Sequence, residues 1–308
     1  MRCALGVIVF LAAGVLAVGG AEEPDEAGVD QGLIRDYSSF RLSQKSLVPK
    51  GARSCAKGGC HGADLSGRDE GTFGKEWSIW YEKTEARHRK AYELLESERS
   101  KNMAALLSAF DQLESNPTER KDCLSCHAMD VPDSPEHTTQ FKITEGVSCE
   151  ACHGRATHWI ESHSNNGWKS KTAEQKASLG MYDTRDLIRR AELCMSCHVG
   201  DDDRNVTHRM MAAGHPELPF ELATDLIGVP HHWRNGRSFL NPKKNEGPAF
   251  HARVWAVGQA MLLRESARRA MRWAESSEGV ELALFECYAC HHELGFSTPA
   301  AVRHQDRK

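Results

Sequence analysis

A pair of cysteines followed directly by a histidine recurs five times along the 308-residue chain, and this repeat constrains the fold more than any other feature. One copy lies in the stretch GVSCEACHG, from Gly146 to Gly154. Two thiols three positions apart with an adjoining imidazole form the attachment unit of a c-type haem. Each thiol forms a thioether with one haem vinyl group, and the histidine becomes the proximal axial ligand of the iron.

The five units supply all predicted attachment sites. The first unit, which begins at Cys55, has four residues between its thiols, and the other four units have two. The predicted attachment cysteines are Cys55, Cys60, Cys123, Cys126, Cys149, Cys152, Cys194, Cys197, Cys287 and Cys290. The predicted proximal iron ligands are His61, His127, His153, His198 and His291. We therefore expect five haem c groups, the first of them on the wider unit.

Paired cysteines also occur in zinc knuckles and in disulfides. Neither requires a histidine directly after the second cysteine of every pair. With 16 His in 308 residues, chance puts a histidine at such a position about 5% of the time. Five such histidines in five units therefore favour haem attachment.

The N-terminus predicts export. A positive start, Met1-Arg2, is followed by an uncharged apolar run and then by the small residues Gly19-Gly20-Ala21. This order is typical of a secretory signal peptide, here residues 1–21, and the run is short for a membrane span. An uncleaved N-terminal anchor is the alternative. We expect a periplasmic protein without a transmembrane span in its mature chain, with an extended lead-in over residues 22–54 and one multihaem domain over residues 55–308.

Charge limits the partners. The net charge of −4 becomes about −5 when Arg2 is removed with the signal peptide. Five ferric haems with ionised propionates would bring the holoprotein to about −10. This balance excludes nucleic acid as a partner and suits redox proteins that are basic, or membrane-bound and linked to quinol.

Helical periodicity is strongest in two segments. Apolar residues recur at three- and four-residue spacing from about Trp77 to Leu113. A second amphipathic helix is predicted from about Ala249 to Ala274, with arginines on its polar face. Its apolar face comprises Phe250, Val254, Val257, Met261 and Met271.

Between these segments the chain is less regular. Lys171 to Leu193 predicts one or two helices, and Asp201 to Asp203 a solvated turn. Proline and glycine make His208 to His232 a structured crossing segment. Because Cys126 and Cys149 are only 23 residues apart, we expect their haems to be neighbours.

The sequence around Cys149, the histidines that follow it and the segment AAGHP that ends at Pro216 resemble multihaem cytochromes of the cytochrome c-554 family. The context of His88 shares this resemblance, which runs from about Cys55 to His292. It implies a mostly α fold with little sheet, irregular loops and a core of closely stacked haems ligated mainly by two histidines. The fifth unit and the wide spacing of the first depart from the tetrahaem pattern.

A second axial histidine is needed for each such iron. The favoured candidates are His88, His163, His208, His215 and His232. His158 competes with His163, and His231 with His232. His137 and His251 are further candidates, whereas His292 and His304 suit propionate or solvent contacts better.

Two functions follow from these sites. Closely spaced bis-histidine haems would relay electrons between redox partners, and such a carrier is not an enzyme. The alternative is an oxidoreductase with one five-coordinate haem that acts on a small nitrogen or sulfur species. Pentahaem nitrite reductases carry a unit that ends in lysine, and the sequence contains no Cys-x-x-Cys-Lys, so we expect the carrier.

Overall fold

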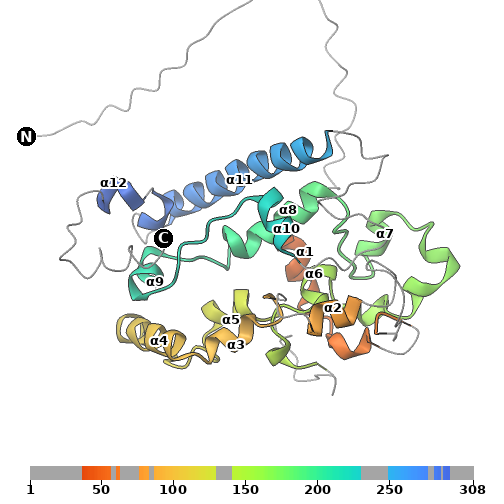
Figure 1. Ribbon diagram of the computed structural model, residues 1–308, viewed down its shortest axis with the longest axis horizontal. Coiled ribbons are helices and arrows are strands. Elements are labelled where there is room, and N and C mark those ends of the chain that lie inside the picture. The colour runs from red at the N-terminus through yellow and green to blue at the C-terminus, as the bar shows by residue number, and fades with distance from the viewer. Residues whose placement is uncertain are drawn as a thin grey trace, which may run out of the picture. The chain divides into compact units, whose positions relative to one another are not determined.

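The computed structural model describes residues 37–56, 60–62, 76–82, 87–129, 141–229, 249–276, 281–285 and 287–291 (Figure 1). Every regular element in these ranges is a helix, which confirms the mostly α fold. None of the described helices is both long and apolar enough to cross a membrane. The predicted signal peptide lies outside the described residues.

Ten longer or well-packed helices organise the chain. They are α1 (Tyr37–Gln44), α2 (Glu76–Glu82), α3 (Ala91–Leu95), α4 (Glu98–Asp111), α5 (Lys121–His127), α6 (Cys149–His153), α8 (Leu187–His198), α9 (His208–Ala213), α10 (Leu222–Gly228) and α11 (Phe250–Glu275). The remaining helices are short: η1 (Ala52–Ser54), η2 (Ile143–Glu145), η3 (Ala156–His158), η4 (Ser162–Ser164), η5 (Asn166–Trp168), α7 (Ala173–Ala177), η7 (Leu282–Leu284) and α12 (Cys287–His291).

Helix α11 covers α8 and α10, and these three helices enclose the largest apolar cluster of the described residues (Figure 1). The cluster comprises Ala191, Met195, Leu222, Leu226, Val254 and Met261. Val254 and Met261 lie two turns apart on α11, so one face of this helix is buried as the periodicity predicts. Met271 was expected on that face, but its side chain is 62% exposed. It belongs to the last turns of α11, beyond the buried residues of that helix.

The lead-in is not wholly extended, because α1 forms within it. Tyr37 and Phe40 are buried, and they pack against Tyr182 with ring centroids 5.1 and 4.8 Å from it. Helix α1 also contacts α8. Aromatic residues three positions apart lie on one helical face, which explains why this stretch folds onto the domain.

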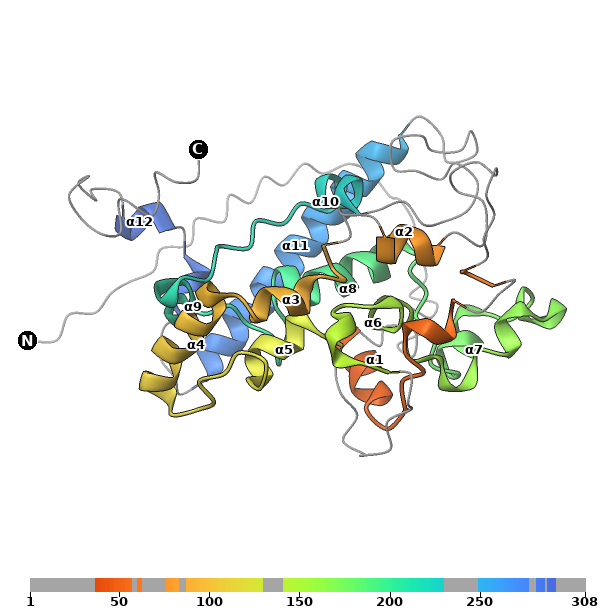
Figure 2. The same cartoon turned by 60° about the horizontal axis from the view of Figure 1, so that its bottom comes forward.

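Three helices replace the single helical pattern expected over Trp77 to Leu113. Helix α4 begins after Ser97, whose hydroxyl accepts a hydrogen bond from Ser100 N, and ends at Gln112 in the left-handed conformation. Such N-caps stabilise a helix start and interrupt the preceding helix. Helix α4 packs against α9, so a segment before the second unit lies beside one after the fourth unit (Figure 2).

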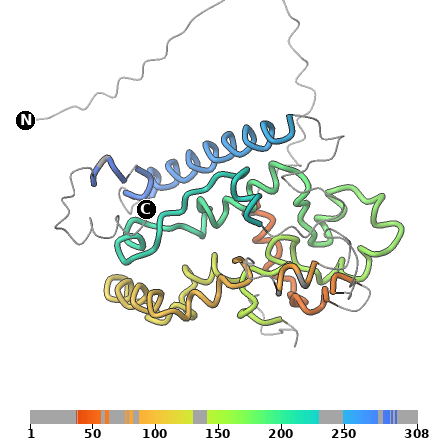
Figure 3. Tube along the Cα trace, in the orientation of Figure 1, coloured from red at the N-terminus to blue at the C-terminus, as the bar shows by residue number. Residues whose placement is uncertain are grey.

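The central segments match their predictions more closely. Lys171 to Leu193 contains α7 and most of α8, and α8 continues through the fourth unit to His198. In the crossing segment that starts at His208, two short helices, α9 and α10, are joined by a stretch without regular structure (Figure 3).

Candidate haem sites

Four of the five units lie at the C-terminal end of a helix, and that helix ends at the unit's histidine in each case. These helices are α5, α6, α8 and α12. In a helix, residues at i, i+3 and i+4 share one face. The two thiols and the imidazole of each of these units are therefore presented together. Among the described cysteines none forms a disulfide, as attachment by both thiols requires.

Four proximal histidines each face a histidine from a distant part of the chain. His61 faces His163 with ring centroids 6.0 Å apart, and His88 faces His198 at 6.0 Å. His127 faces His215 at 6.4 Å, and His208 faces His291 at 6.3 Å. His88, His163, His208 and His215 are four of the five predicted second ligands.

These separations fit one iron between each pair of rings. A metal–nitrogen bond to histidine is about 2 Å long, and the ring centre lies about 1.2 Å behind the nitrogen. Two imidazoles on opposite sides of one metal therefore have centres about 6.4 Å apart. The recurrence of a centroid separation of 6.0 to 6.4 Å in four pairs favours a shared metal over direct hydrogen bonds between the imidazoles.

The other candidate histidines are placed differently. His158 is exposed in η3, and His251 is exposed on α11 beside Phe250. His153 lies half-buried at the end of α6. His232, together with His137, His231, His292 and His304, lies outside the described residues.

Backbone carbonyl groups hold several of the paired rings. His127 Nδ1 is 2.9 Å from Ala91 O, and His215 Nδ1 is 2.8 Å from Pro216 O. His163 Nδ1 bonds with Ile160 O. Such bonds fix the tautomer and leave Nε2 for a metal. Burial lowers the pKa of His215, which favours the neutral ring that iron ligation requires.

Tryptophans enclose two of the paired histidines. Trp80, which is buried, stacks on His88 with ring centroids 6.0 Å apart and planes within 7°. Trp159 and Trp168 meet His163 edge-on at 5.3 and 6.5 Å. The sequence reasoning missed all three. The proximity of Trp159 and Trp168 to His163 along the chain was the available signal.

Two buried carboxylates anchor the backbone before the first unit. Glu150, inside the third unit, accepts hydrogen bonds from the backbone N–H of Lys50 (3.0 Å), Gly51 (2.7 Å) and Ala156 (2.7 Å). Glu145 accepts from Ala52 N at 3.0 Å. Burial raises the pKa of both carboxyls, although these backbone donors oppose the shift. The first and third units are thus joined through charged side chains.

The aspartate run after the fourth unit is not a simple solvated turn. Asp201 is 5% exposed, and it accepts hydrogen bonds from Asp203 N and Arg204 N, both at 3.0 Å. Arg41 pairs with Asp203 at 2.5 Å and lies 3.8 Å from Asp201. The backbone donors and the α1 arginine explain the burial, because a paired carboxylate can be removed from water.

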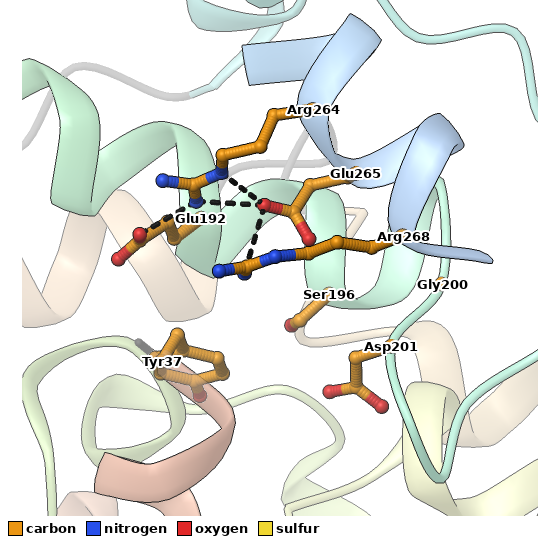
Figure 4. Close-up of a pocket in the computed structure, with 8 residues that line it drawn as sticks. All are labelled: Tyr37, Glu192, Ser196, Gly200, Asp201, Arg264, Glu265 and Arg268. Carbon is orange, nitrogen blue, oxygen red and sulfur yellow. Dashed lines mark hydrogen bonds and ion pairs between the residues drawn. The ribbon is translucent and has the colours of Figure 1, made fainter. Parts of the chain in front are cut away.

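Ion pairs also join α8 to α11 beside this turn. Arg264 bonds with Glu192 at 2.6 Å and with Glu265 at 2.7 Å, and Arg268 approaches Glu265 at 3.5 Å (Figure 4). The close-up shows these groups opposite Tyr37 of α1. The ion pairs therefore join α8 to α11 next to the fourth unit.

Thiols of different units lie next to one another. The Cys55 side chain interacts with that of Cys149, and the Cys126 side chain with that of Cys197. The neighbouring Cys126 thiol and the Arg204 guanidinium, which lies 3.3 Å from the sulfur, lower the pKa of Cys197 to about 6 against the opposing effect of burial. The first unit thus adjoins the third, and the second adjoins the fourth. The expectation that the haems of the second and third units are neighbours rests on their short sequence separation and stays a prediction.

Two further contacts extend this order. Cys152 interacts electrostatically with Cys194 and Cys197, so the third unit adjoins the fourth. A cavity of ≈ 230 Å³ is lined by both His198 and Cys287, and this places the fifth unit beside the fourth. The spatial order is therefore first, third, fourth and second, with the fifth beside the fourth.

Comparison with protein families gives one match. Residues 54–154 match the family described as cytochrome c554 and c-prime. Over these residues the chain is similar to the cytochrome c-554 family. The match covers the first three units and about a third of the chain, so the chain is a c-type cytochrome with an electron-transfer role and haem c as its cofactor. No curated protein and no solved structure gave a match.

Proposed function

We propose that the protein is an exported pentahaem cytochrome c that relays electrons between redox partners through closely spaced bis-histidine haems. The observation that carries this proposal is the set of four histidine pairs with ring centroids 6.0 to 6.4 Å apart. Each pair combines one motif histidine with one from elsewhere in the chain. Each bound haem supplies a one-electron Fe(III)/Fe(II) couple.

The chain's residues would hold the haems in a fixed order. Cysteines of the five units would attach them. Four of the irons would be held by histidine pairs, namely His61 with His163, His127 with His215, His198 with His88 and His291 with His208. His153 and His232 remain the proposed ligands of the third haem. Two histidines per iron leave no position for a substrate, which supports a carrier over a catalyst.

The adjoining thiols support transfer between units. Because Cys55 adjoins Cys149, and Cys152 adjoins Cys194, electrons would pass from the first haem through the third to the fourth. From the fourth haem, electrons would continue to the second haem, because Cys126 adjoins Cys197. They would also continue to the fifth haem, because Cys287 and His198 line the same cavity. Because the units adjoin one another, electrons could tunnel from haem to haem in this order.

Export and partners belong to the same proposal. The signal-like residues 1–21 support a periplasmic location, and haem attachment to c-type cytochromes takes place outside the cytoplasmic membrane. The net negative charge supports basic redox partners, including basic surfaces of membrane-bound, quinol-linked proteins.

Three measurements on the protein purified from its native periplasm test the proposal. Mass spectrometry of the mature chain is expected to show five haems on the ten motif cysteines, and a reductive titration should take up five electrons per chain. Added carbon monoxide should leave the ferrous spectrum unchanged, because both axial positions are filled. Fewer haems, or zinc in their place, would refute the pentahaem proposal, and carbon monoxide binding would favour an open, catalytic iron.

A further inference from the structure

We propose that Glu76 is a positioning residue for His61, and that its carboxylate makes the first haem the low-potential end of the relay. The inference rests on the proposed function, since it assigns a direction to the same haems. It concerns a residue outside every motif of the sequence and adds a property that haem attachment alone does not give.

The geometry brings the carboxylate to the ring nitrogen that faces away from the metal. Glu76 Oε2 lies 3.3 Å from His61 Nδ1, and the side chains are 17% and 31% exposed. The backbone N–H of Trp77 donates to His61 O at 2.9 Å. This bond fixes the first turn of α2 against the first unit, so the approach of Glu76 is set by backbone and not by a flexible side chain alone.

The first unit differs in this respect from the second. The ring of His127 bonds with a neutral backbone carbonyl, as do those of His163 and His215. His61 instead faces a group with a full negative charge. A carboxylate that accepts the Nδ1 hydrogen increases the basicity of the ring as a metal ligand. A more basic ligand stabilises the more positive iron, which is Fe(III), and therefore lowers the reduction potential.

The place of the first unit gives this difference a functional meaning. In the order of adjoining thiols the first unit is terminal, because Cys55 contacts the third unit, which in turn contacts the fourth. A low potential at one end of a series favours electron transfer away from that end. The first haem would accept electrons from the donor and pass them toward the fourth.

The test is an EPR-monitored redox titration of the five-haem protein carrying Glu76→Gln. Glutamine keeps the shape and removes the charge. One low-spin haem should become easier to reduce, with its Fe(III)/Fe(II) ratio at a fixed potential lowered about tenfold, a change as large as the smallest effect of such outer partners on metal affinity. The other haems should titrate as in the wild type. Glu76→Asp keeps the negative charge on a shorter side chain, so the potential of this haem should lie between those of the wild type and of Glu76→Gln.

Glu161→Gln is the matched control. Glu161 is exposed and lies two residues before His163, the second ligand proposed for the same haem, so this variant removes an equal charge from a residue close to that ligand in sequence. It should leave the titration unchanged. An unchanged titration in Glu76→Gln, or an equal shift in both variants, would overturn the role of Glu76.

Haem content separates this inference from the proposal on which it rests. If the wild-type protein lacks a haem on Cys55 and Cys60, both the pentahaem proposal and the role of Glu76 are wrong. If the haem is present and low-spin but Glu76→Gln does not move its potential, the relay stands and the assignment of Glu76 is wrong.

Discussion

The backbone around the first and third units and the helical layer of α8, α10 and α11 are stabilised in different ways. Around the first and third units, Glu145 and Glu150 accept hydrogen bonds from main-chain N–H groups. The helical layer instead buries apolar side chains such as Leu222 and Val254. A region of short helices cannot satisfy its backbone internally, so charged side chains do so. Long amphipathic helices satisfy their own backbone and can pack through apolar faces.

The largest expected effect comes from breaking the polar region. Glu150→Ala leaves three backbone N–H groups, two of them buried, without their acceptor, at a cost of about 3 to 5 kcal/mol of stability. Hydrogen exchange measured by mass spectrometry should rise over residues 48–56 and 149–156. Exchange in α11 should stay slow. An equal rise in α11 would show that the two regions unfold together.

Leu222→Ala instead removes a buried side chain from the apolar layer of α8, α10 and α11. Leu222 is 1% exposed, and truncation of such a side chain costs about 3 kcal/mol through lost burial and a residual cavity. Exchange should rise in α8, α10 and α11 and not around Glu150, the reverse of the previous pattern. Leu263→Ala is the control, because Leu263 on the same layer is 72% exposed.

Gly258→Ala tests the packing of the apolar layer with a smaller structural change than Leu222→Ala. A Cβ at this position would lie 2.8 Å from Leu222 Cβ, closer than side chains pack. Overpacking of this kind costs about 1 to 3 kcal/mol, which denaturant unfolding would show as a lower midpoint. An unchanged unfolding midpoint would mean that α10 and α11 can move apart without loss of stability.

The smallest effect is a pH dependence confined to the polar region. Burial raises the pKa of Glu145 above its unfolded value of about 4.3. Its contribution to stability is therefore complete below the unfolded pKa and is lost as pH rises through the folded pKa. Glu145→Gln should flatten the dependence of the unfolding midpoint between pH 4 and neutrality. A steeper dependence in the variant would contradict this sign.

Sequence patterns predicted local features better than distant contacts. The cysteine–histidine units and the α11 helix follow from spacings within a few residues, which a helix fixes. Four of the predicted second ligands face a motif histidine. The apolar helical context of His88 and the Pro/Gly-rich segment around His208 and His215 indicated three of them, and His163 follows the third unit closely. The roles of Glu150 and Asp201 depend on backbone groups from far along the chain, so no local pattern reveals them. The same holds for the adjacency of Cys55 and Cys149.

Ferric EPR with spin counting on His163→Gln and His158→Gln tests the central claim most directly. These histidines lie five residues apart, but only His163 faces a motif histidine. If the facing rings share an iron, His163→Gln should convert one equivalent of low-spin haem per chain to a high-spin or altered form, and His158→Gln should leave the wild-type spectrum. An unchanged spectrum for His163→Gln, or the same change in both variants, would contradict the assignment of histidine pairs to irons.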